Sequence, residues 1–459
     1  MRGTEETAER QALYERLLRE NPRLYRPARD LPRPAADPAA VVFRYVLAPA
    51  LGAFTRWLLE ETEQAGIRRL YFLARDGYFF CEAARILAEA YRLPVECRYL
   101  SCSRYSLRLP LFHLNRQAAL NAICRGGLRV TPGRILRRAG LTAEERTETL
   151  RLLALPWAEG ETVPYARLGD VRRRLEKCGY FLACMDRHSR QALPGLAGYL
   201  RQEGLLDGVP DAVVDSGWTG TIQQTLGEAL AYLGRTAGLT GYYWGLYELP
   251  DGVRRADYHS YYFAPEGDLR QKAGFNNNLF EAVYTAPHGM TLGYRRDGET
   301  YAPVYGALSA SRRAFVERTG TYLTAYVRKL AQEGRVPFSP GEDRATIRRL
   351  FDAFMGAPTP EEALVFGSLP FSDDVLEGEE TPLAAPLSEV ELRRGHAVPR
   401  LLSMAGLRAA PARESAWYEG SAVRGGRHIR RHLRQNKLYQ YLRHERKIRR
   451  ARRRKEEAL

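Results

Sequence analysis

Short apolar runs alternate with polar turns and helical patterns in two parts of the chain. In the first, Leu70 to Leu73 is a continuous apolar run with the length of a buried strand, and residues 74–77 form a polar turn. Tyr78 to Tyr91 has the Ala and Leu content of a helix, and residues 95–100 have the pattern of a second strand. This order predicts a parallel βαβ unit over residues 67–104.

The same order of elements returns further along the chain. Ala212 to Val214 predicts a buried strand, and residues 215–220 predict a tight polar turn. Thr221 to Leu233 predicts a helix whose apolar residues fall on one stripe, and residues 239–247 predict another strand. Strands that alternate with helices indicate an α/β fold built on a parallel sheet.

The remaining pattern is mainly helical. A long helix is expected from Ala40 to Ala65, with a kink at Pro49. Residues 105–205 are expected to form a helical insertion between two halves of the sheet. The predicted organisation is a loosely held N-terminal arm and linker (1–40), an α/β core (41–250), a smaller α+β region ending in a loose acidic connection over 357–395 (251–395), and a basic helical tail (396–459).

Composition favours a globular protein of the cytoplasm. The chain has 459 residues, of which 45% are hydrophobic, and six cysteines that form neither a CxxC pair nor a metal-ligand spacing. Its net charge of +16 is concentrated between Ser421 and Leu459, a segment that contains fifteen Lys and Arg but only three Glu. The first 30 residues are charged, and arginines interrupt the apolar stretch from Val41 to Leu59, so we expect a core helix there rather than a membrane span.

The two polar turns share one order of residues, in which an Asp and then a Gly follow a strand and precede a helix. If the two strands are neighbours, Asp76 and Asp215 flank one crevice at the carboxyl edge of the sheet. Free N–H groups at the helix starts would suit a phosphate there, with Mg²⁺ held by Asp215. The alternative is that each Asp only caps its helix. The expected ligand-binding residues are Arg75, Gly77, Ser103, Arg104, Ser216, Gly217, Trp218, Thr219, Gly220 and Thr221.

The segments Tyr-Phe-Leu-Ala-Arg-Asp-Gly77 and Val-Val-Asp-Ser-Gly-Trp-Thr-Gly-Thr221 resemble type I phosphoribosyltransferases over about a third of the chain. The resemblance implies a phosphoribosyltransferase-like core in which residues 74–77 bind diphosphate and residues 216–221 bind a 5-phosphate. It also implies that Asp215 contacts the ribose hydroxyls. The chain departs from the family at Ser216, which replaces a second acidic residue, and in a shorter loop whose Trp218 has no counterpart.

A wider resemblance covers roughly residues 41–305 and includes Phe280-Glu281 and His288-Gly289. It is to the C-terminal region of predicted haloacid-dehalogenase-superfamily hydrolases of bacterial surface-polysaccharide gene clusters. The dehalogenase signature Asp-x-Asp is missing from both turns, which counts against an aspartyl-phosphate phosphatase. Glu281 and His288 are candidates for an acid/base pair at the crevice, or else ordinary hydrogen-bonded residues under a loop.

The tail interleaves Arg with Ile, Leu and Tyr over residues 424–455, which predicts a basic amphipathic helix. Such a helix could lie on an anionic membrane surface, bind nucleic-acid phosphates without reading sequence, or stay solvated. We favour the membrane, and therefore a peripheral position at the inner membrane face. No sequence-specific nucleic acid is expected.

Three functions fit these features. The favoured one is a cytoplasmic transferase that binds a phosphorylated, nucleotide-linked or otherwise diphosphate-activated sugar in surface-polysaccharide biosynthesis. The second is a phosphohydrolase acting on sugar phosphates in the same crevice. The third is a non-catalytic, ligand-sensing scaffold with a membrane-docking tail.

Overall fold

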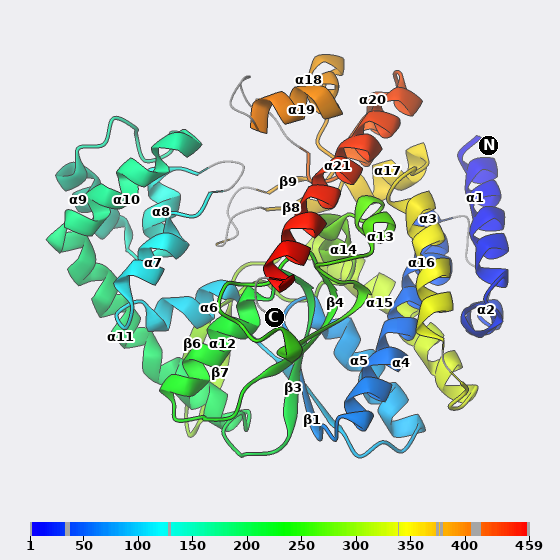
Figure 1. Ribbon diagram of the computed structural model, residues 1–459, viewed down its shortest axis with the longest axis horizontal. Coiled ribbons are helices and arrows are strands. Elements are labelled where there is room, and N and C mark those ends of the chain that lie inside the picture. The colour runs from blue at the N-terminus through cyan, green and yellow to red at the C-terminus, as the bar shows by residue number, and fades with distance from the viewer. Residues whose placement is uncertain are drawn as a thin grey trace.

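A five-stranded parallel sheet forms the centre of the computed structural model (Figure 1). The helical insertion lies on one side of the sheet and the N-terminal helices lie on the other. The predicted α/β fold with a parallel-sheet core and added helical regions is therefore confirmed. The structure describes residues 2–32, 37–126, 130–337, 339–372, 376, 380–404 and 415–456.

The strands of the sheet are β1 (Arg69–Leu73), β2 (Glu96–Leu100), β3 (Asp211–Trp218), β4 (Thr240–Leu246) and β5 (Tyr258–Phe263). Their order is β2-β1-β3-β4-β5, and every neighbouring pair is parallel. The chain adds β2 on one side of β1 and then adds β3 on the other. The strand order thus reverses between β1 and β3, and in open α/β sheets ligands bind at the carboxyl ends of strands that flank such a reversal.

Alternate strand residues face two different helical layers. Leu70 and Phe72 pack in the larger core, whereas Tyr71 and Leu73 pack on the opposite face of the sheet. Both faces are covered, which is why Leu70 to Leu73 of β1 and Ala212 to Val214 of β3 are apolar at every position rather than at every second one. The first layer contains α4 (Ala48–Gln64), α5 (Gly77–Ala90) and α15 (Ala310–Gln332), and the second contains α11 (Gly179–Gln202) and α12 (Thr221–Tyr232).

Strand β3 runs further than the sequence predicts. It continues to Trp218, because Gly217 pairs with Gly245 of β4. The predicted turn over residues 215–220 is therefore wrong for its first four residues, which belong to the strand. As a consequence, Asp215 is held by the sheet rather than by a loop.

The predicted long helix is present and begins slightly earlier, at Pro38. It consists of α3 (Pro38–Val42), a wider π-helical turn η1 (Phe43–Leu47) and α4. The wide turn comes directly before Pro49, which has no N–H to donate to the preceding turn. This helix is long and apolar enough to cross a membrane, but 94% of its most apolar window is buried inside the protein.

The N-terminal segment is not the loosely held arm that its prolines suggest. It forms α1 (Arg2–Arg19) and α2 (Pro22–Arg29), and Tyr14, Leu18 and Leu24 are completely buried. Pro22 takes the first position of α2, where a missing N–H costs nothing, so it starts a helix instead of a linker. The linker residues 33–36 lie outside the described part of the chain.

The helical insertion has a hydrophobic core of its own, separate from both sheet layers. Its prediction as helical is confirmed, including the capping box in which Thr142 and Glu145 cap each other's backbone. It comprises α6 (Arg104–Arg108), η2 (Leu109–Leu111), α7 (Arg116–Ile123), α8 (Pro132–Arg138), α9 (Ala143–Leu153), η3 (Tyr165–Arg167), α10 (Leu168–Lys177) and the long α11.

The expected boundary at residue 250 does not separate two regions. Strand β5 completes the central sheet, and α15 packs on α4 and α5 in its larger core. The expected loose connection over 357–395 also includes packed elements, because Phe366 and Leu383 are fully buried. The other elements are η4 (Arg255–Asp257), α13 (Leu269–Ala273), α14 (Asn277–Val283), β6 (Thr291–Asp297), β7 (Thr300–Tyr305), α16 (Pro340–Phe354), α17 (Pro360–Gly367), β8 (Pro370–Phe371), β9 (Thr381–Pro382), α18 (Glu389–Arg394) and α19 (Ala397–Met404).

The basic tail is helical, as predicted, and lies along the body of the protein (Figure 1). It consists of α20 (Tyr418–Gly425) and α21 (Ile429–Glu456). Helix α21 packs against α13, α19 and α20, which buries Tyr439 and Ile448. Part of its apolar side is therefore occupied by the protein itself, while Leu438 and Leu442 stay exposed.

Candidate functional site

The two polar turns meet at the carboxyl edge of the sheet. Strands β1 and β3 are direct parallel neighbours, so residues 74–76 and 215–221 emerge side by side. Both contribute to a cavity of about 410 Å³, which we call the crevice. The peptide bonds Ala74–Arg75 and Gly217–Trp218 in these segments are both cis. The predicted residues that line the crevice are Arg75, Asp76, Ser103, Arg104, Asp215, Ser216, Gly217, Trp218, Thr219, Thr221 and Glu281.

Asp76 is not a helix cap. It precedes α5, but its carboxylate makes no capping hydrogen bond to that helix. It accepts a hydrogen bond from the Ser216 hydroxyl across the β1–β3 junction instead. Burial raises the pKa of Asp76, while Ser216 and the nearby Arg75 and Arg104 act in the opposite direction. The side chain thus joins the two turns and faces the crevice.

Asp215 is the most deeply placed carboxyl group of the crevice. It points from β3 with only 7% of its surface exposed. Burial raises its pKa well above the ordinary value, and the neighbouring carboxyl groups of Asp76 and Glu281 raise it further. Hydrogen bonds from the backbone of Ser216 and Gly217 lower the pKa but do not offset these effects. Such a carboxyl group gains from a cation or from a proton-donating ligand.

Glu281 reaches the same crevice from α14, on a different part of the chain. The indole N–H of Trp218 donates a hydrogen bond to its carboxylate. Burial and the charge of Asp76 raise the pKa of Glu281 to about 7, although Trp218, Arg104 and Arg75 lower it. A carboxyl group with a pKa near neutrality can both accept and donate a proton at physiological pH.

The crevice also contains groups that are suited to bind an anion. Helix α12 begins at Thr221, and Gly220 before it provides no side-chain cap for the first N–H groups. The hydroxyls of Thr219 and Thr221 lie 3.4 Å apart at this helix start. Arg104 is exposed and makes no hydrogen bond or ion pair with another described residue. These groups line the same cavity as the three carboxyl groups, and the charge of Arg104 acts on both Asp76 and Glu281.

The predicted glycines are all closely packed, and of the three only Gly217 also lines the crevice. Gly217 has a φ of +130°, and a Cβ there would lie 1.9 Å from the carbonyl oxygen of Gly245 in β4. A Cβ on Gly77 would contact the backbone of Phe72, and Gly220 has a φ of +64°. Gly77 and Gly220 do not line the crevice, so their prediction as ligand-binding residues is not supported.

His288 also lies outside the residues that line the crevice. Its Nδ1 donates to the carbonyl oxygen of Gly289 at 2.8 Å, and its Nε2 then accepts from the Tyr99 hydroxyl at 2.8 Å. Its ring stacks on Tyr305, and burial lowers its pKa, which keeps the ring neutral. Of the two alternatives for this residue, the structure favours the hydrogen-bonded residue under a loop.

Ser103 has a structural role besides lining the crevice. Its hydroxyl accepts from the backbone N–H of Ser106 as the cap of α6 and donates to the carbonyl oxygen of Thr291. It therefore fixes the start of α6, and with it the position of Arg104. The Ser103 hydroxyl hydrogen is used by Thr291, so the hydroxyl could donate to a ligand only by giving up that bond, although its second lone pair could still accept from a ligand donor.

Sequence reasoning missed several residues of the crevice. Asn277 and Asn278 line it from the first turn of α14. Their spacing of four and three residues from Glu281 places all three on one helix face, a signal that was available in the sequence. Arg125 comes from the helical insertion and carries no such signal. The others are Cys102, Ile222, Met290, Thr291, Phe371 and Ser372, while Ala74 belongs to the turn that the resemblance implies.

Among the residues that the structure describes, no group of three or more His, Cys, Asp or Glu is arranged to hold a metal ion. A Mg²⁺ ion does not need such a group, because it commonly binds one or two carboxylates together with substrate phosphates. No protein-family model and no curated protein matches the chain.

Proposed function

We propose that the crevice binds a phosphorylated or diphosphate-activated sugar and transfers its glycosyl group to an acceptor, as a transferase of surface-polysaccharide biosynthesis. The observation that carries this proposal is the meeting of two kinds of group in one cavity. Asp76, Asp215 and Glu281 supply carboxyl groups, while Arg104 and the start of α12 supply groups suited to phosphate. A ligand with a phosphate at one end and a hydroxyl-bearing ring at the other would contact both.

Binding of the phosphate uses the backbone as well as charge. The first N–H groups of α12 have no side-chain cap, and the helix start, with the positive end of the helix dipole, lies at Thr221, which lines the cavity. Thr219 and Thr221 add hydroxyl donors, and Arg75 and Arg104 add positive charge. As the sugar–phosphate bond breaks, negative charge grows on the departing phosphate, and these groups stabilise it.

The carboxyl groups of the crevice act on the sugar ring and on the acceptor hydroxyl. Positive charge develops on the ring as the bond to phosphate weakens, and the buried carboxyl group of Asp215 is placed to stabilise it. Glu281, with a pKa of about 7, takes the proton from the acceptor hydroxyl. Asp76 keeps Ser216 in place and so connects the two strand ends.

The cofactor of this proposal is Mg²⁺. Asp215 is the residue that would hold it, because a cation would relieve the repulsion that its buried carboxyl group has with Asp76 and Glu281. When bound together with substrate phosphates, the ion would neutralise part of their charge.

The two family resemblances also support this proposal of a transferase that binds a phosphorylated sugar in surface-polysaccharide biosynthesis. Residues 219–221 lie at the start of a helix that follows a parallel strand, which supports the phosphoribosyltransferase-like interpretation, whereas residues 216–218 belong to the strand. The surface-polysaccharide context rests on the wider resemblance over residues 41–305 alone. The phosphohydrolase alternative uses the same crevice, and release of free phosphate without an acceptor would favour it. Unchanged biological function after loss of both Asp76 and Asp215 would favour the scaffold.

The test is Asp215→Asn in the full chain, with Asp297→Asn, on the exposed end of β6, as the control. Sugar phosphates, nucleotide sugars and phosphoribosyl diphosphate are screened by thermal shift with and without Mg²⁺. We expect Asp215→Asn to abolish the Mg²⁺-dependent part of the best ligand's shift and to reduce transfer about a hundredfold. The control should match the wild type. Ligand shifts and activity that are the same in all three proteins would refute the proposal.

The same variant has a predicted effect on stability. The folded-state pKa of Asp215 is raised, so its ionisation disfavours the folded state as the pH increases above the unfolded value. Asp215→Asn should therefore raise the free energy of unfolding by ~1–2 kcal/mol at pH 8 and by much less at pH 4, measured by urea denaturation. A stability loss at pH 8 would contradict the assigned burial of charge.

A further inference from the structure

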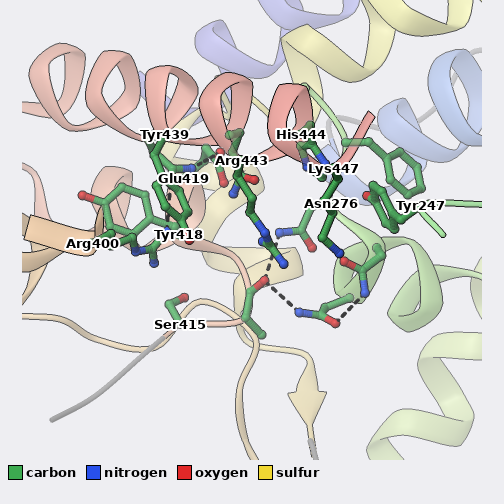
Figure 2. A pocket seen from close by; sticks show the side chains of 16 residues that line it. Tyr247, Asn276, Arg400, Ser415, Tyr418, Glu419, Tyr439, Arg443, His444 and Lys447 are labelled. Atoms are coloured by element: carbon green, nitrogen blue, oxygen red, sulfur yellow. Dashed lines mark hydrogen bonds between the residues drawn. The ribbon is translucent and has the colours of Figure 1, made fainter. Parts of the chain in front are cut away.

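A second cavity of about 410 Å³ lies between α21 and the body of the protein (Figure 2). Its wall opposite α21 is formed by the segment around Asn276 and by residues 415–419. Figure 2 shows Arg443 and Lys447 extending from α21 toward these two segments. We call this cavity the tail pocket.

Positive charge dominates the tail pocket near α21. Arg443 is exposed and makes no hydrogen bond or ion pair with a described residue. Lys447 forms a half-exposed ion pair with Glu248 at 3.4 Å, which leaves two of its three donors available. An anion between these two side chains would accept bonds from both.

The single acidic residue among the described lining residues of the tail pocket is already compensated. Glu419 accepts a hydrogen bond from Asn436 at 2.6 Å, and Asn436 accepts one from Arg400 at 3.3 Å. Arg400 also lies over the rings of Tyr418 and Tyr439. This arrangement neutralises the Glu419 side of the pocket, so Arg443 is left to attract an anion.

His444 provides an observation independent of surface charge. Its side chain lines the tail pocket and is 95% buried, since only 5% of its surface is exposed. Its Nδ1 is completely buried and has no hydrogen-bond partner in the described part of the chain. Burial, Arg443, Lys272 and Lys447 lower its pKa to about 3, so the ring is neutral. An unsatisfied buried polar atom of this kind costs about 1–3 kcal/mol unless a ligand or water completes it.

The ring of His444 is held in place by its neighbours. It stacks on Tyr247, with ring centroids 5.1 Å apart and planes 14° from parallel. A ring held by this stack presents Nδ1 in one direction, and in the tautomer that carries its proton on Nδ1 this atom is a donor. Together with Phe275, Tyr418 and Tyr439, this stack gives the pocket aromatic walls that suit a sugar or a planar ring.

We propose that the tail pocket is a second binding site, for a small molecule that carries a phosphate or diphosphate group. Arg443 and Lys447 bind the anionic oxygens, and Nδ1 of His444 donates the hydrogen bond that it otherwise lacks. Asn277 and Asn278 line both the tail pocket and the crevice, so the two sites share a wall on α14. The site does not depend on the function proposed for the crevice.

The test is calorimetric titration of the full chain with inorganic pyrophosphate. Arg443→Gln removes the central charge, and Arg446→Gln is the matched control, since Arg446 is an exposed arginine of the same helix that does not line the pocket. His444→Phe keeps the stacked ring but removes Nδ1. All titrations are repeated with Arg104→Gln, which weakens the crevice, so that the two sites are separated.

We expect Arg443→Gln to weaken pyrophosphate binding about tenfold or more and His444→Phe to weaken it severalfold. Arg446→Gln should stay within about twofold of the wild type. A site that disappears with Arg443→Gln but survives Arg104→Gln supports the tail pocket even if the crevice binds nothing. Equal losses with Arg443→Gln and Arg446→Gln, or unchanged binding in folded Arg443→Gln protein, would overturn the proposal. Circular dichroism and the thermal midpoint verify the fold of each variant.

Discussion

At the scale of single residues, the side chains of the crevice control one another's protonation. Trp218 illustrates this, because it packs among Phe263, Phe275 and Phe280 while its indole N–H reaches Glu281. A hydrogen bond to a carboxylate stabilises the charged form and lowers the pKa. Trp218 is therefore a positioning residue that holds the Glu281 carboxylate and keeps its pKa from rising further.

Replacing Trp218 by Phe should keep the aromatic packing and remove this hydrogen bond. We expect the pKa of Glu281 to rise from about 7 by about one unit, because the charged form loses its donor. A ¹³C NMR titration of labelled glutamate carboxyl groups measures the change without a known substrate. Tyr247→Phe, which removes a hydroxyl from the same aromatic cluster, should leave the titration unchanged; a fall of the pKa in Trp218→Phe would contradict the assignment.

The sequence could place a residue at the crevice only where the strand before that residue could be recognised. Asp76 and Asp215 follow apolar runs that read clearly as buried strands, so their meeting could be predicted. Glu281 could be named as a candidate. Its hydrogen bond with Trp218, however, depends on how α14 packs against the sheet, which no local sequence pattern encodes. For His288 the sequence left two alternatives open, because it does not tell which histidines already have partners for both ring nitrogens.

At the scale of elements, the close approach of β3 and β4 determines the shape of the crevice. The strand continues through Gly217 because this residue has no Cβ, which would otherwise lie against the backbone of Gly245, while the missing Cβ of Gly245 leaves room for the ring of Phe263. The sequence pattern suggested a turn there, since Asp, Ser and two glycines within six residues are typical turn residues. The pairing partner on β4, distant in sequence, decided the outcome.

Gly217→Ala should therefore disrupt the protein. The new Cβ would lie 1.9 Å from the Gly245 carbonyl oxygen, at a φ that L-residues rarely adopt, so we expect a loss of ~3 kcal/mol or more in the free energy of unfolding. Gly227→Ala in α12 is the matched control, because no atom lies within 4 Å of its added Cβ. That control should gain ~0.5–1 kcal/mol from helix propensity. Urea denaturation measures both, and a stable Gly217→Ala protein would contradict the observed strand contact.

At the scale of the whole molecule, the first helix packs against a segment near the other end of the chain. Arg10 and Tyr14 of α1 both bond to the carboxylate of Glu362 in α17, at 3.0 and 2.6 Å. Both side chains of the ion pair are largely buried. Such contacts across some 350 residues cannot be anticipated from local patterns, which is why the N-terminal segment was expected to be loose.

Glu362→Gln should test how much this junction contributes. Gln can still accept from Tyr14 but leaves the buried guanidinium of Arg10 without its counter-charge, so we expect a loss of about 3 kcal/mol in the free energy of unfolding. Glu9→Gln, on the exposed side of α1, is the control and should change stability by less than ~0.5 kcal/mol. Equal stability of the two variants would show that α1 is not held by this pair.

The packing of the basic tail on the rest of the molecule limits how the tail could bind a membrane. Because α21 packs Tyr439 and Ile448 against the body, it cannot insert its whole apolar side into a bilayer without leaving the protein. Attraction to an anionic membrane surface through residues 424–455 stays a prediction, and it would act mainly through the exposed arginines. It would therefore weaken as salt is added.

The run of asparagines at the start of α14 carries one last implication. Asn277 and Asn278 belong to both cavities, and Glu281 follows on the same helix. If an occupant of one cavity shifts this turn and so alters affinity in the other by some factor, thermodynamic reciprocity requires the second occupant to alter affinity in the first by an equal factor. Because Asn277 and Asn278 line both the crevice and the tail pocket, binding at one site could change the affinity of the other without any movement of a domain.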